Sequence, residues 1–118
     1  MERFIAYLDS RIEEGKEEIK ALEADGRRDD ANFAKIRTNI YDVCKKIAGA
    51  LTFSLKIAGK PEEAAGAVKA QFERLSSTWG AALEKAREND DVVSIAVEET
   101  KLAALEDITD RFKEVTGE

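Results

Sequence analysis

Apolar residues recur at intervals of three and four over four long segments, and this spacing constrains the fold more than any other feature of the chain. Residues so spaced lie on one face of an α-helix, so each segment predicts an amphipathic helix. The first segment carries Ile5, Leu8, Ile12, Gly15, Ile19 and Leu22 on such a stripe. The pattern predicts four helices, at about residues 2–24, 30–58, 61–88 and 91–116.

Short polar connections separate the four segments. Their turn and cap residues are Gly26, Asp29, Asp30, Gly59, Pro61 and Asp91. Glycine suits a left-handed C-cap, proline suits the first position of a helix, and aspartate suits an N-cap. Connections this short make consecutive helices antiparallel. We therefore predict an all-α, antiparallel up-down-up-down four-helix bundle in one domain, residues 1–118. Helices of this length also suit a pair of hairpins that dimerises.

Histidine is absent, and the chain has one Cys and one Pro among its 118 residues. Without His there is no Ser-His-Asp or Cys-His nucleophile system and no Glu-x-x-His di-iron bundle. A lone Cys44 forms neither an internal disulfide nor a thiolate zinc site, and it is expected to act as a small core residue. These absences predict a protein that is not an enzyme and holds no metal or cofactor.

The charge balance limits the partners. The net charge is −6, and the basic residues form no patch, which argues against nucleic-acid binding. The longest uncharged runs, 47–55 and 75–83, are much shorter than the ~20 residues that span a bilayer, so no membrane partner is expected. A single cysteine is typical of a reducing compartment, which predicts a cytoplasmic protein.

Glycine occurs four times inside the predicted helices, where each costs roughly 1 kcal/mol relative to alanine. These residues are Gly15, Gly49, Gly66 and Gly80. Counting from the turns places Gly15 level with Trp79, Gly49 with Phe4 and Gly66 with Phe53. We expect the missing side chains to make room for the rings. The alternative is a hinge or a close approach of the backbone to a ligand.

The last segment breaks its own apolar pattern at Glu98 and Lys101, which fall where core residues are expected. One interpretation is a slight helix rotation, with Lys101 reaching solvent along its alkyl chain. A second is a buried Glu98–Lys101 pair, or a cation–π contact between Lys101 and Trp79. A third is a ligand site. Gly15, Trp79, Glu98 and Lys101 together form the candidate pocket.

The second segment is apolar over roughly 220° of its circumference from Cys44 onward, whereas a bundle helix needs a stripe only somewhat wider than ~100°. Either this helix is unusually central, or part of its surface meets another chain. The candidate contacts are Tyr41, Leu51, Phe53 and Leu55.

Two functions from different classes follow. The favoured prediction is a small acidic protein-interaction or structural module that binds a protein partner or itself, with a homodimer as one form. The alternative is a small-molecule-binding bundle with its pocket near Trp79, Glu98 and Lys101. A third, weaker interpretation is an acidic bundle that neutralises a basic toxin or mimics nucleic acid.

Overall fold

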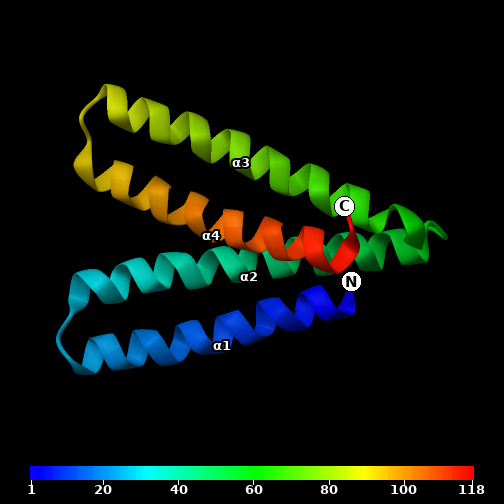
Figure 1. Cartoon of the computed structure of the whole chain (residues 1–118), viewed down its shortest axis with the longest axis horizontal. Coiled ribbons are helices and arrows are strands. Elements are labelled where there is room, and N and C mark those ends of the chain that lie inside the picture. Colours follow the sequence, from blue (N-terminus) through cyan, green and yellow to red (C-terminus); the bar gives the residue numbers. More distant parts are fainter.

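The computed structural model describes residues 1–118 and contains helices without strands. The elements are α1 (Glu2–Ala24), α2 (Arg28–Ile57), the short 3₁₀ helix η1 (Pro61–Glu63), α3 (Ala64–Glu88) and α4 (Val92–Thr116). Figure 1 shows each long helix running back along the one before it. The predicted four-helix bundle is confirmed, and every helix begins and ends within a few residues of its predicted position. None of the helices is long and apolar enough to cross a membrane.

The connections follow the expected turn chemistry with one correction. Gly26 and Gly59 take left-handed conformations, with φ of 74° and 75°. Asp91 caps α4, because its carboxylate accepts a hydrogen bond from the backbone N–H of Ser94. The prediction that Asp29 or Asp30 caps α2 is wrong, because the helix already begins at Arg28 and both acids lie in its first turn. In the first turn their negative charges still interact favourably with the helix dipole.

Three phenylalanine rings from three helices form the centre of the core. The Phe112 ring lies 5.0 Å from Phe4 and 5.6 Å from Phe72, both edge to face, and Phe4 lies 6.0 Å from Phe72. Each ring is at most 2% exposed. Such contacts add to the free energy gained by burying large apolar surfaces. The trio therefore ties α1, α3 and α4 together.

The two hairpins, α1–α2 and α3–α4, lie together at one end and separate at the other. Figure 1 shows them meeting near both chain termini and diverging toward their turns. We call these the closed end and the splayed end. The molecule measures 48 × 35 × 22 Å, and its radius of gyration is 15.7 Å. A compact domain of this length would have a radius of gyration of about 13.5 Å. The bundle is therefore flat and open.

Helix α2 is the central helix, which accounts for much of its wide apolar surface. It packs against all three other long helices. Cys44 and Ala48 are fully buried within it, and burial raises the pKa of the Cys44 thiol to about 12. The prediction of Cys44 as a core residue is thus confirmed. The last turns of α2 differ, since Phe53 is 66% and Ile57 72% exposed.

Only one of the helix-interior glycines has a close neighbour, and it is not an aromatic ring. A Cβ atom on the buried Gly15 would overlap the side chain of Thr38. A Cβ atom on Gly49, Gly66 or Gly80 would meet no atom within 4 Å. The predicted pairing of glycines with rings is therefore wrong. The crossing of the hairpins turns Phe4 toward the other phenylalanines, and Phe53 faces solvent.

Candidate functional site

Three of the four predicted pocket residues come together between α3 and α4. The Lys101 ammonium lies 5.0 Å from the centre of the Trp79 ring and 3.1 Å from Glu98 Oε1. The side chains of Lys101 and Glu98 are 23% and 15% exposed. The second carboxylate oxygen of Glu98, Oε2, is buried and has no hydrogen-bond partner. Gly15 lies apart, against Thr38 of α2, because the splay separates α1 from α3 at this height.

The contact of Trp79, Glu98 and Lys101 is closely packed. These side chains line none of five surface clefts whose volumes range from about 50 to about 500 Å³. The geometry matches the interpretation in which Lys101 covers the Trp79 ring and pairs with Glu98. Such a cation–π contact contributes about 0.5–2 kcal/mol, depending on how far it is removed from water. It fastens α4 to α3 within the second hairpin.

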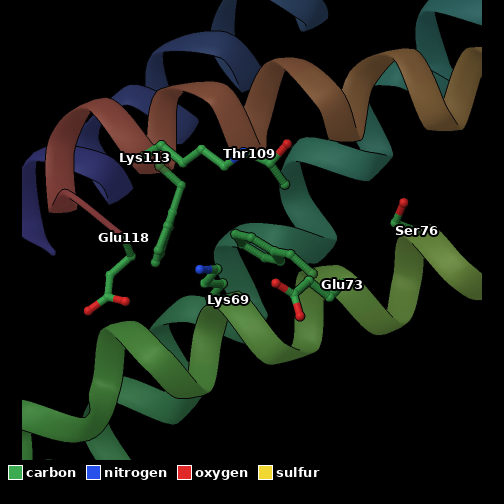
Figure 2. A pocket seen from close by; sticks show the side chains of 8 residues that line it. Lys69, Glu73, Ser76, Thr109, Lys113 and Glu118 are labelled. Carbon is green, nitrogen blue, oxygen red and sulfur yellow. The ribbon is translucent and has the colours of Figure 1, made fainter.

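A cleft of about 470 Å³ opens between α3 and the second half of α4, as Figure 2 shows. Its polar lining consists of Lys69, Glu73, Ser76, Thr109, Lys113 and Glu118, with Phe72 and Phe112 beneath. None of the four charged residues forms an ion pair within 4 Å. The two rings are almost covered, so the accessible lining comes from the polar and charged residues, including their aliphatic carbons. That lining offers a ligand little aromatic surface to bury.

A polar cluster that the sequence did not predict joins the hairpins at the closed end. It consists of Tyr7, Arg11, Tyr41, Asp107 and Arg111, and we call it the Asp107 cluster. The Tyr7 and Tyr41 hydroxyls both donate to Asp107 Oδ2, at 2.6 and 2.5 Å. Arg11 donates to the Tyr41 hydroxyl at 3.1 Å and lies 5.1 Å from the centre of its ring, and Arg111 lies 4.5 Å from the Tyr7 ring. The cluster therefore links α1, α2 and α4.

The Asp107 cluster stabilises one set of protonation states. Partial burial opposes ionisation of Asp107, but the two phenol hydrogen bonds and the nearby guanidinium groups outweigh it and lower its pKa. Burial, then the bond to Asp107, raises the pKa of Tyr41, and the same causes raise that of Tyr7. The arrangement is a charged acceptor between two neutral donors. The cleft beside it, lined in part by Arg11 and Tyr41, has a volume of about 50 Å³.

The cluster could not be recognised in the sequence, because charged and polar residues at these spacings are typical of the solvent-exposed face of a helix. Tyr7 and Arg11 lie four residues apart, directly before the core residues Leu8 and Ile12. Asp107 and Arg111 are also four residues apart, and each directly precedes a core residue, Ile108 or Phe112. These two i, i+4 spacings beside core positions were the only sequence pattern that could have indicated the cluster. A charge beside a core stripe is common on any amphipathic helix, so the signal is weak.

The predicted interface residues of α2 divide into two groups. Tyr41 is only 4% exposed and bonds within the chain, so its prediction as an interface contact is wrong. Leu51 and Leu55 are half-buried, and Leu51 packs against the core. Phe53 is strongly exposed, as an interface residue would be. The α2 surface is therefore smaller than the sequence indicated.

A second exposed apolar surface lies at the splayed end. The first turns of α4 read VVSIAV, yet no residue from Val92 to Val97 is buried, and Val92 and Val93 are 75% and 72% exposed. A groove of about 500 Å³ runs between this part of α4 and α2. It is lined by Asp30, Phe33, Arg37, Ala96, Glu99, Thr100 and Ala103. Helical spacing places Val92 and Val93 at either side of the stripe that Ala96 and Ala103 continue.

Comparison with protein-family models, curated proteins and solved structures finds no match to this chain. The structure also contains no group of three or more His, Cys, Asp or Glu side chains placed to hold a metal ion.

Proposed function

We propose that this chain is a non-catalytic protein-interaction module that binds its partner through the splayed end. The binding surface consists of Phe33, Val92, Val93, Ala96 and Ala103, and we call it the splayed-end surface. The observation that carries the proposal is the apolar start of α4, which the chain's own core leaves uncovered. A contiguous apolar surface that stays exposed normally marks an interaction site.

The position of this surface supports the proposal. No side-chain hydrogen bond or ion pair joins the two hairpins at the splayed end, because the links between them all involve Asp107. A helix could therefore enter the groove between α2 and α4 without breaking a polar contact between the two hairpins. Interaction through an amphipathic helix in an apolar groove is a common mode of protein recognition.

The test uses Val93→Glu with Phe53→Glu as its matched control. Both variants replace an exposed apolar residue and change the net charge equally, and a glutamate in the first turn of α4 favours the helix dipole. Each purified protein is immobilised, exposed to a lysate of its host, and the retained proteins are measured by mass spectrometry. We expect at least one protein to be retained by the wild type and by Phe53→Glu and lost with Val93→Glu. Identical sets for all three proteins would overturn the proposal.

The small-molecule alternative rests on the cleft of Figure 2 rather than on Trp79. Four unpaired charges of both signs favour a small polar molecule with both a cationic and an anionic group. Chemical-shift changes confined to Lys69, Ser76 and Thr109 on addition of such a compound would support this function. Their absence at millimolar concentrations of amino acids would count against it.

A further inference from the structure

We propose that the partner of the splayed-end surface is a second copy of this chain, bound as a two-fold symmetric dimer. In this dimer the first turns of α4 in each copy lie in the α2–α4 groove of the other. The inference rests on the proposed function and adds the identity of the partner. Three observations carry it: the exposed area, the shape of the surface and the charges around it.

The exposed area matches what a dimer requires. The chain exposes 7388 Å². A compact monomer of its mass would expose about 6,400 Å², so the excess is about 1,000 Å². A stable protein–protein interface buries about 800 Å² on each partner. Closing the splayed end against a second copy would therefore remove about the area by which this chain exceeds a compact monomer.

The shape of the surface is complementary to itself. A two-fold interface buries the same patch on both copies, so the patch must contain both a protrusion and a recess. Val92 and Val93 protrude at the start of α4, and the groove beside them has alanine at positions 96 and 103 of its α4 wall. Small side chains in the groove leave room for a branched one. One patch of this chain thus supplies both halves of the contact.

The charges around the groove have both signs. Asp30, Arg37 and Glu99 line it, so the rim is not a strongly acidic surface that requires a basic partner. Each of these groups already pairs within its own chain, with Arg27, Glu18 and Arg87 in turn, so a second copy would meet a rim of paired charges. At long range, however, two chains of net charge −6 repel each other. Added salt screens that repulsion, so dimerisation should strengthen between about 20 and 300 mM salt. Binding of a basic protein would weaken over the same range.

The experiment is sedimentation equilibrium of the purified full chain, with three variants of equal charge. Val93→Glu and Ala96→Glu alter the surface, and Phe53→Glu alters an exposed apolar residue away from it. We expect the wild type and Phe53→Glu to reach about twice the chain mass of 13.1 kDa. The other two variants should dissociate at least about tenfold more readily, since a buried charge would lack a partner. Far-ultraviolet circular dichroism checks that each variant is folded.

Two results would overturn the inference. One is a wild-type chain that stays at 13.1 kDa up to millimolar concentration. The other is a dimer that Phe53→Glu disrupts and Val93→Glu does not, which would place the interface at the end of α2. The wild type could be monomeric while immobilised wild type retains a different host protein that Val93→Glu does not retain. In that case the dimer inference is wrong, but the proposed interaction function stands. If nothing is retained either, the proposed function fails as well.

Discussion

The closed end and the splayed end are built from the same four helices but cover their apolar residues very differently. At the closed end Phe4, Phe72 and Phe112 are at most 2% exposed, and the Asp107 cluster adds hydrogen bonds between the hairpins. At the splayed end no such link exists, and Val92 is 75% exposed. One end thus holds the hairpins together, and the other leaves apolar side chains exposed to solvent.

Each hairpin is also held within itself at the splayed end, by different means. The first hairpin has ion pairs between α1 and α2, such as Arg37–Glu18 and Lys35–Glu23. The second has the ion pair Arg87–Glu99 and, in addition, Lys101 over the Trp79 ring. Exposed ion pairs contribute about 0–1 kcal/mol each. The tips are thus held by contacts inside each hairpin, with no side-chain hydrogen bond or ion pair between the hairpins.

The largest expected effect is the loss of an aromatic ring at the closed end. Phe112→Ala removes the ring that contacts both other phenylalanines and should lower the free energy of unfolding by about 3–5 kcal/mol. Phe33→Ala at the splayed end should cost less than about 1 kcal/mol, because Phe33 is only half-buried. Urea denaturation of dilute protein measures both. Equal losses would contradict the contrast between the two ends.

A second prediction concerns close packing inside the first hairpin. Gly15→Ala should destabilise the protein by about 1–3 kcal/mol, because the new methyl group would overlap Thr38. Gly49→Ala should instead stabilise it by up to about 1 kcal/mol, because that position has open space and alanine favours the helix. Thermal denaturation compares the two variants. A neutral Gly15→Ala would show that α1 and α2 are not in contact there.

The Asp107 cluster gives a pH-dependent prediction for the closed end. Asp107→Asn should lower the free energy of unfolding by about 1–2 kcal/mol at pH 7. This is at the low end of the range for hydrogen bonds to charged groups, because the carboxylate is partly exposed. The pKa of Asp107 is lowered by folding, so its contribution is present above about pH 4 and is lost as the pH falls further. The gap between variant and wild type should therefore narrow as the pH falls below about 4. A gap that does not change with pH would argue against the ionised acceptor.

The smallest expected effect is on the stability of the monomer at the splayed end. Val93→Glu should change the free energy of unfolding by less than about 0.5 kcal/mol in dilute solution, because Val93 is 72% exposed. Chemical denaturation at concentrations where the chain is monomeric measures it. A loss of 2 kcal/mol or more, on the order of a core substitution, would show that Val93 serves the fold instead of a partner.

The helices were predictable because their signals are local. Apolar spacing and caps such as Gly26 and Asp91 depend only on neighbours in the sequence, and they fixed the helix bounds closely. The contact of Lys101 with Trp79 was among the alternatives, because a charge at a core position stands out beside the only Trp. Both cases rest on patterns that lie within one or two adjacent helices.

The angle between the hairpins was not predictable in the same way. Counting residues from the turns assumes that all four helices run side by side along their whole length. Instead, the contacts among Phe4, Phe72 and Phe112 hold the two hairpins together at one end only. The hairpins diverge toward the other end, so Gly15 does not lie beside Trp79. The Asp107 cluster depends on that same arrangement. Features that depend on contacts between segments distant in the sequence could therefore not be predicted from the sequence.

Both termini lie at the closed end, as Figure 1 shows, and the contact of the Phe4 and Phe112 rings places them near each other. A tag or fluorescent protein fused to either terminus would stand at the end of the molecule opposite to the proposed binding surface. The same arrangement would allow the termini to be joined by a short linker and the chain reopened elsewhere. Immobilisation through a terminal tag would then present the hairpin tips, freely accessible, to the solution.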